Sequence, residues 1–226
     1  MDEDLILMFV GRHHQDVMQL NNAWCQRNGG SLSSAMRTLT TNKNLQYALQ
    51  ICTNPNQNDA PEKPFDPALI HRDVNRLEGI LSMTFTSTNS GDSVSPTVLD
   101  IILRRNLSGV QQLALYFETA TGSKLDETIR KSSLDDMTKK IAVHAVRTAL
   151  DLTYRDIMNV KDVISKSGKE EDLAIRVVRA HWYGVHWEQI QASWMGINHQ
   201  TFKDKVRKLP KGLFRDLIMA MTGPSS

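Results

Sequence analysis

The sequence predicts an all-α protein built from three copies of one helical unit. Apolar residues recur three and four positions apart, as in Val17, Leu20 and Trp24, which is the spacing of one face of a helix. The same arrangement returns after 92 or 93 residues and again after a further 76 or 77. No convincing run alternates apolar and polar residues, so strands are not expected.

The repeat is defined by aligned positions that are apolar in all three copies. The aligned sets are Leu32, Leu125 and Phe202; Met36, Ile129 and Val206; Trp24, Phe117 and Trp194; Leu20, Leu113 and Ile190; Phe9, Ile102 and Val178; Leu45, Met137 and Leu213; and Leu49, Ile141 and Leu217. So many matches at nearly constant offsets favour a true repeat. Glycine or clusters of Ser, Thr and Asn separate the short helices within each unit.

The repeats divide the chain into four segments. Residues 1–56 form the first repeat, 57–65 a polar linker with prolines, 66–150 the second repeat and 151–226 the third. The second and third repeats are expected to have five helices each. The first is expected to have four, because the helix that should precede "DEDLILMF", residues 2–9, is missing.

Two helix starts are marked clearly. Asp66 followed by Pro67 is typical of an N-cap and the first helical position, and a matching helix is expected near Asp151. The apolar faces predicted for these two helices are Ile70, Val74, Leu77 and Leu81 in the first, and Tyr154, Ile157, Val160 and Ile164 in the second.

The bulk composition is that of an ordinary soluble globular chain. Of 226 residues, 40% are hydrophobic and 23% charged, and the formal charge is +2. No apolar run is long enough to span a bilayer, and the acidic N-terminus does not resemble a signal peptide. Cys25 and Cys52 lack a CxxC spacing and are expected to be core thiols in a reducing compartment. A cytoplasmic protein is therefore expected.

Catalytic and metal motifs are missing from the sequence. It has no nucleophile elbow, P-loop, GxGxxG or HExxH pattern, and no histidine pair with the helical spacing of a metal site. No enzymatic activity is expected.

Four stretches of the chain resemble the annexins, most of all their fungal branch. They are "DEDLILMFVGRH", "DPALIHRDVNRLEGIL", "LDIILRRNLSGVQQLALYFETATGSKLDETI" and "YRDIMNVKDVISKSGKEEDLAIRVV". The resemblance implies four repeats of five helices, named A to E, arranged as a curved disc. The longer first offset matches the longer connection between annexin repeats two and three, so this chain looks like repeats two to four.

The resemblance also implies a peripheral membrane protein that binds anionic phospholipid through calcium. Calcium takes six to eight oxygen ligands. In annexins, carbonyl groups of a glycine-rich loop between helices A and B supply several of them, and a carboxylate between helices D and E supplies more. Glycine suits such a loop because the backbone must adopt unusual dihedral angles.

This chain departs from the annexin calcium pattern. The positions of the expected carboxylates are occupied by Leu39, Ser132 and Leu209. The residues left as candidates for a degenerate calcium loop are Ser90, Gly91, Asp92, Ser93, Asp136, Ser167 and Gly168. Asp135 and Asp136 come a few residues late, where acidic residues also favour the start of a helix. Calcium is possible as a cofactor, but the standard sites are predicted to be absent.

Lysines in the same loops offer a contact with membranes that needs no calcium. They are Lys43, Lys131, Lys166, Lys169, Lys208 and Lys211. Each basic residue near an anionic leaflet contributes about 1 kcal/mol to binding. The expected partner is an anionic phospholipid membrane, with the protein peripheral at its surface.

The sequence is also compatible with two other functions. The chain could be a scaffold that binds a protein partner and has lost calcium and lipid binding. Less favoured is a helix-turn-helix DNA binder at residues 187–209, with Gly196 as the turn and Ile197 buried after it. The aromatic stretch that contains Trp182 and Trp187 is open to two interpretations, core packing or an anchor at the membrane interface.

Overall fold

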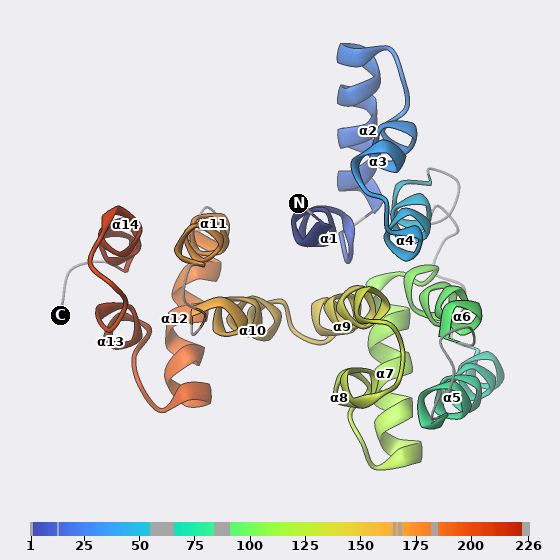
Figure 1. Cartoon of the computed structure of the whole chain (residues 1–226). Helices are drawn as coiled ribbons and strands as arrows, with labels where there is room; N and C mark the ends of the chain where they lie inside the picture. The colour runs from blue at the N-terminus through green and yellow to red at the C-terminus, as the bar shows by residue number, and fades with distance from the viewer. Residues whose placement is uncertain are drawn as a thin grey trace. The chain divides into compact units, whose positions relative to one another are not determined.

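The prediction of an all-α fold is confirmed. A computed structural model describes residues 2–12, 14–54, 66–83, 91–164, 166, 169–181 and 185–222. Within these residues there are 14 α-helices and no strand (Figure 1). The linker predicted at 57–65 lies outside the described residues.

The helices are short, as the glycine and Ser/Thr/Asn punctuation predicts. In chain order they are α1 (Asp2–Phe9), α2 (His14–Asn28), α3 (Leu32–Leu39), α4 (Lys43–Thr53), α5 (Pro67–Ser82), α6 (Gly91–Leu103), α7 (Leu107–Thr121), α8 (Leu125–Lys131), α9 (Asp136–Leu150), α10 (Leu152–Ile164), α11 (Glu170–His181), α12 (Val185–Asn198), α13 (Phe202–Arg207) and α14 (Leu213–Met221).

The helices form two compact units, each with its own apolar core. The first unit, residues 1–150, holds α1 to α9, and the second, residues 151–226, holds α10 to α14. In the repeat alignment, α1 to α4 correspond to helices B to E of the first repeat. Helices α5 to α9 and α10 to α14 correspond to A to E of the second and third repeats.

The two predicted helix starts are present. Asp66 Oδ1 accepts hydrogen bonds from the amides of Ala68 and Leu69 at 3.0 and 3.2 Å. Asp151 caps α10 in the same way, through the amides of Thr153 and Tyr154 at 2.8 and 3.0 Å. The predicted inward residues that are buried are Ile70, Val74, Leu77 and Leu81 on α5, and Ile157, Val160 and Ile164 on α10.

Most aligned positions of the repeat are core positions. The first residues of α3, α8 and α13 are each 2% exposed, and the residues one turn later are also buried; these six are Leu32, Leu125, Phe202, Met36, Ile129 and Val206. In the second unit the rings of Trp187 and Trp194 stack edge-on against Phe202, with centroids 5.4 and 5.0 Å away. Trp187 is therefore a core residue, while Trp182 lies outside the described residues.

The alignment fails in three places. Leu20 is 41% exposed although its counterparts on α7 and α12 are buried, and Val177 is fully buried while Val178 is only partly so. On α14 the buried residue is Ile218, whereas Leu213 and Leu217 are 88% and 45% exposed. The alignment of α14 was one residue out of register, because apolar residues stand next to each other there and spacing alone could not choose between them.

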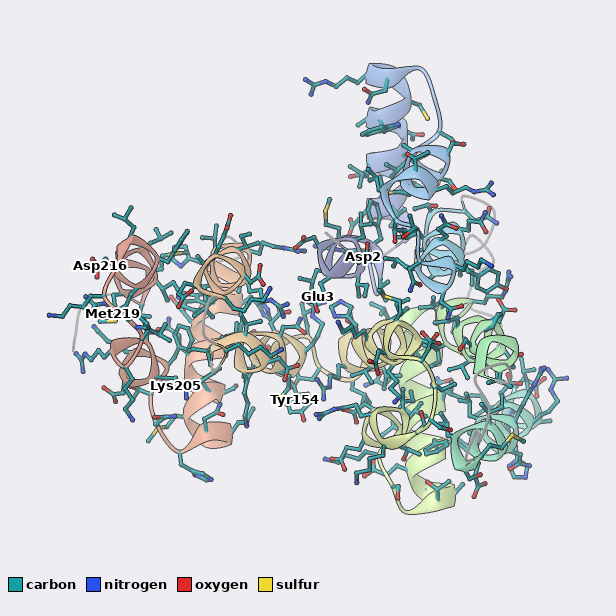
Figure 2. All side chains as sticks on the ribbon, viewed as in Figure 1. Asp2, Glu3, Tyr154, Lys205, Asp216 and Met219 are labelled. Atoms are coloured by element: carbon teal, nitrogen blue, oxygen red, sulfur yellow. The ribbon has the colours of Figure 1, made fainter. Side chains whose placement is uncertain are left out.

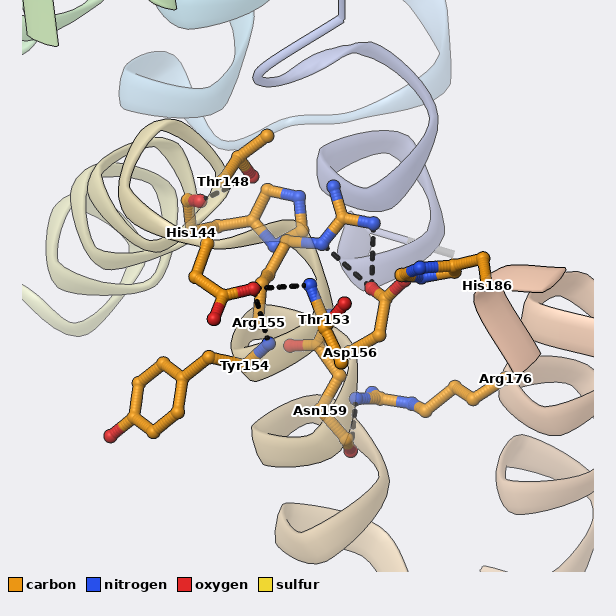
Figure 3. A network of polar contacts seen from close by, with 10 residues as sticks. His144, Thr148, Thr153, Tyr154, Arg155, Asp156, Asn159, Arg176 and His186 are labelled. Carbon is orange, nitrogen blue, oxygen red and sulfur yellow. Dashed lines mark hydrogen bonds and ion pairs between the residues drawn. The ribbon is translucent and has the colours of Figure 1, made fainter. Parts of the chain in front are cut away.

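Polar contacts hold α10 to its neighbours in the second unit (Figure 3). Arg155 Nε donates to Asp156 Oδ1 at 2.7 Å, and His186 Nε2 on α12 lies 2.8 Å from Asp156 Oδ2. Arg176 on α11 donates to the carbonyl oxygen of Asn159 at 2.8 Å. The Asp156 carboxylate thus fixes α10 against α12.

The first and second repeats pack on each other inside the first unit. Helix α4 contacts α6 and α9, and α1 contacts α9. Gly11, which follows α1, has a φ of +74°, and a Cβ there would lie 2.8 Å from the side chain of Thr148 on α9. Glycine is required at this position both by its dihedral angle and by the close approach of α9.

Candidate functional site

The loops before α4, α9 and α14 are where annexin-type calcium carboxylates would stand. Leu39 is the last residue of α3, and Leu209 is a half-buried residue that packs against the core of the second unit. Ser132 is 8% exposed, and its hydroxyl donates to the carbonyl oxygen of Ile129 at 2.7 Å. None of the three positions offers a carboxylate.

The nearest carboxylate, Asp135, is engaged in the structure. Its Oδ1 accepts the amide of Thr138 at 2.9 Å and so caps α9, while Oδ2 accepts the hydroxyl of Ser95 at 2.7 Å and the amide of Asn44 at 3.0 Å. Burial alone would raise the pKa of this carboxyl, but the hydrogen bonds from Thr138, Ser95 and Asn44 together lower it. Asp135 therefore joins α9 to α4 and α6.

Only some of the residues predicted for a degenerate calcium loop lie in the described part of the chain. Asp136 is exposed at the first position of α9. Gly91, Asp92 and Ser93 form the first turn of α6, while Ser90, Ser167 and Gly168 lie outside the described residues. No cluster of three or more His, Cys, Asp or Glu side chains suited to a metal ion occurs in the described part of the chain. At the three expected positions the described residues therefore supply no carboxylate to a calcium ion.

A hydrogen bond nevertheless connects the end of α5, a helix A, to the loop between α8 and α9, the D–E loop of the same repeat. The Ser133 hydroxyl donates to the carbonyl oxygen of Met83, directly after α5, at 2.6 Å. Met83, the residue after α5, therefore lies beside the loop that precedes α9. Two segments that are 50 residues apart in sequence meet at one surface.

The predicted lysines lie at this surface and at its counterparts in the other repeats. All six are exposed: Lys43, Lys131, Lys166, Lys169, Lys208 and Lys211. Because Asn44 bonds to Asp135, the loops that carry Lys43 and Lys131 are neighbours. Lys169 pairs with Asp172 at 2.8 Å, and Lys208 lies 3.4 Å from Gln200 Oε1, both at exposed positions.

Solved structures share this architecture. A calcium-bound structure of alpha-14 giardin superimposes with a TM-score of 0.78 at 14% identity, over 99% of this chain and 70% of the other. A mutant of annexin A8 gives 0.77 at 13% identity, over 99% and 67% of the two chains. Chicken annexin V in complex with Zn2+ gives 0.76 at 16% identity, over 100% and 68%.

The chain has the annexin fold. It spans about two thirds of the length of these annexins, which corresponds to about three repeats. No family model and no curated protein matches the sequence. Among the described helices, none is both long and apolar enough to cross a membrane.

The annexin fold accounts for the helix-turn-helix look of residues 187–209. Gly196 lies inside α12, so its assignment as the turn is wrong; the chain turns at 199–201, where His199 has a φ of +54°. The helix after the turn, α13, has six residues, and both Phe202 and Val206 on it are buried. Its Arg207 pairs with Asp204 at 2.9 Å. The segment is a C–D helix pair packed into the repeat core.

A cavity in the first unit does not contain a reactive thiol. It has a volume of about 600 Å³ and is lined by residues of the first and second repeats, among them Arg12, Arg105 and Cys52. Desolvation raises the pKa of the Cys52 thiol to about 12, so this thiol is protonated at neutral pH. Cys25 and Cys52 are both free and half-buried; Cys52 packs against the core of the first unit, whereas Cys25 is not among the residues of that core.

Sequence reasoning missed the role of Asp135 as a joint between three helices. The position of Asp135 directly before a predicted helix indicates an N-cap from the sequence alone. The bonds from Ser95 and Asn44 were not visible, because they connect residues 40 and 91 positions away.

Proposed function

We propose that this annexin-fold chain binds the surface of membranes rich in anionic phospholipid through its lysine-bearing loops. We also propose that this membrane binding does not require calcium sites of the annexin type. The observation that carries it is that the lysines of these loops are exposed, whereas the nearest carboxylate, Asp135, is already bonded to Thr138, Ser95 and Asn44. Cations are therefore available to phosphate, and this carboxylate is not available to calcium.

The expected affinity is moderate and sensitive to salt. Each lysine near an anionic leaflet contributes about 1 kcal/mol, and surface attraction decays over a Debye length of about 8 Å at physiological ionic strength. Several lysines together are enough for reversible association. High salt shortens the Debye length and should release the protein.

The direct test is co-sedimentation with vesicles of phosphatidylserine and phosphatidylcholine. Binding should require phosphatidylserine, should be equal in calcium and in chelator, and should fall as salt rises. Binding only in the presence of calcium would overturn the independence from calcium. Binding in neither condition would favour the alternative, a scaffold that binds a protein partner.

A matched pair of variants tests the surface itself. Lys131 and Lys124 are both exposed and lie at opposite ends of α8, roughly 10 Å apart along a helix of seven residues. Lys131→Glu should weaken vesicle binding roughly tenfold, because a favourable charge is replaced by a repulsive one. Lys124→Glu changes the net charge equally and should have a much smaller effect. Equal losses would indicate general charge attraction and no defined face.

A further inference from the structure

The E helices of the three repeats begin with different residues at one equivalent position. Lys43, Asp136 and Leu213 are the first residues of α4, α9 and α14. The three helices share one register, because the residue five positions later is fully buried in each; these residues are Ala48, Ile141 and Ile218. The charged side chain of the first two repeats is thus replaced by leucine in the third.

Leu213 is far more exposed than other large apolar side chains. Its exposed fraction is 88%, and in the described part of the chain the next largest value for such a residue is 52%, at Met83. Gly212, directly before Leu213, has no side chain, and a Cβ there would meet no atom within 4 Å. Apolar surface in water is unfavourable, so a partner that removes the leucine from water gains free energy.

The first position of an E helix stays on the surface even where two repeats pack on each other. Helix α4 of the first repeat packs against α9 of the second, yet Lys43 and Asp136 are both exposed. The next position differs, because Asn44, the equivalent of Phe214, makes a hydrogen bond to the neighbouring repeat. Leu213, unlike Phe214, therefore occupies a position that lies outside the contact between repeats.

The segment around Leu213 is strongly basic (Figure 2, where Lys205 on α13 and Asp216 on α14 are labelled). Residues 203–216 hold six basic and two acidic side chains, which are Lys203, Lys205, Arg207, Lys208, Lys211 and Arg215 against Asp204 and Asp216. Each of the two carboxylates is in an ion pair at 2.9 Å, Asp204 with Arg207 and Asp216 with Arg215. An anionic surface is therefore the complementary partner of this segment.

The acidic side chains of the helix beside α14 do not cancel this charge. Helix α11 packs against α14, and its first turn holds Glu170, Glu171 and Asp172. Lys166 and Lys169 precede that turn, and Lys169 pairs with Asp172 at 2.8 Å. Over the two segments together, 166–172 and 203–216, three positive charges remain in excess.

Building on the proposed membrane binding, we propose that Leu213 is an apolar anchor, which enters the hydrocarbon edge of an anionic bilayer. Its position is the one that Lys43, a lysine of the proposed membrane-binding loops, occupies in the first repeat. Lys208 and Lys211 precede it in the same loop, and their long side chains can reach headgroup phosphates while the leucine lies deeper. A bilayer offers both the negative charge and the hydrocarbon that this combination of side chains requires.

Vesicle binding at low and high salt separates an apolar anchor from charge attraction. With phosphatidylserine vesicles, Leu213→Ala should raise the dissociation constant about fivefold, because the leucine side chain no longer leaves water on binding. Salt does not screen apolar transfer, so this fold-change should be the same at both salt concentrations, whereas that of Lys131→Glu should shrink as salt rises. Leu213→Phe keeps an apolar side chain and should bind at least as tightly as the wild type. The control is Leu115→Ala on α7, a leucine with 51% exposure outside these loops, which should not change binding.

A phosphatidylserine monolayer tests penetration directly. The wild type and Leu115→Ala should enter the monolayer up to a higher initial surface pressure than Leu213→Ala does, and circular dichroism shows whether each variant remains helical. If the wild type binds vesicles but Leu213→Ala and Leu115→Ala behave alike in both assays, the anchor is overturned and the proposed function stands. If the wild type binds no vesicles, the proposed function is overturned, and the anchor with it.

Discussion

A single carboxylate, Asp135, connects three helices and two repeats. It caps α9 through Thr138 and accepts hydrogen bonds from Ser95 on α6 and Asn44 on α4. Because Ser95 is fully buried, its hydroxyl gains from a charged acceptor in a region that water does not reach. At the scale of one residue, Asp135 stands close to the position expected for an annexin calcium ligand. Its carboxylate stabilises the packing of three helices.

Replacing Asp135 should destabilise the fold. Asp135→Ala should lower the free energy of unfolding by about 2–3 kcal/mol at pH 7, the sum of a lost N-cap and lost charged hydrogen bonds. Asp136→Ala, at an exposed neighbouring position, should cost about 0.5 kcal/mol through the helix dipole alone. Urea unfolding measures both. Similar losses for the two variants would contradict the role given to Asp135.

The same residue predicts a pH dependence. The pKa of Asp135 is lower in the folded protein than its ordinary value, so its contribution is present above the unfolded pKa of about 3.9 and is lost as pH falls through the folded value. Asp135→Asn keeps the cap but cannot titrate. The difference in unfolding free energy between the wild type and this variant should therefore shrink below about pH 4. A difference that is constant from neutral to acidic pH would contradict this prediction.

At the scale of the element, the three E helices differ in how they begin. Asn42 caps α4 by accepting the amide of Leu45 at 3.0 Å, and Asp135, 93 residues later, caps α9. The equivalent position in the third repeat, a further 77 residues on, is Gly212, which offers no side chain to the first turn of α14. The first-turn amide groups of α14 therefore lack the side-chain cap that α4 and α9 have.

Restoring the cap should stabilise α14. A Cβ at Gly212 meets no atom within 4 Å, and its φ of 164° is extended backbone that any residue adopts. Gly212→Asp should raise the free energy of unfolding by roughly 0.5–1 kcal/mol, from the cap and from reduced freedom of the unfolded chain. Gly212→Ala supplies only the second effect, and the difference between the two in thermal unfolding isolates the cap. A gain no larger than that of Gly212→Ala would mean that no cap forms.

Sequence patterns were reliable for helices whose apolar face packs within one repeat. The faces of α5 and α10 and the starts at Asp66 and Asp151 follow from local spacing and capping chemistry, and both are present. The register of α14 was wrong, because Leu213 and Leu217 are as apolar as Ile218 and only the tertiary neighbours decide which is buried. The bonds of Asp135 to Ser95 and Asn44 depend on the same long-range information.

At the scale of the whole molecule, the packing of the first repeat on the second supports the proposed membrane surface. The two repeats pack through their B and E helices, and the bond from Asn44 to Asp135 brings their D–E loops together. Lys43 and Lys131, the exposed lysines beside those loops, therefore come from two repeats but lie on neighbouring parts of the surface. Because each cation near an anionic leaflet adds to binding, this packing of repeats should strengthen the attraction to a membrane beyond that of one repeat alone.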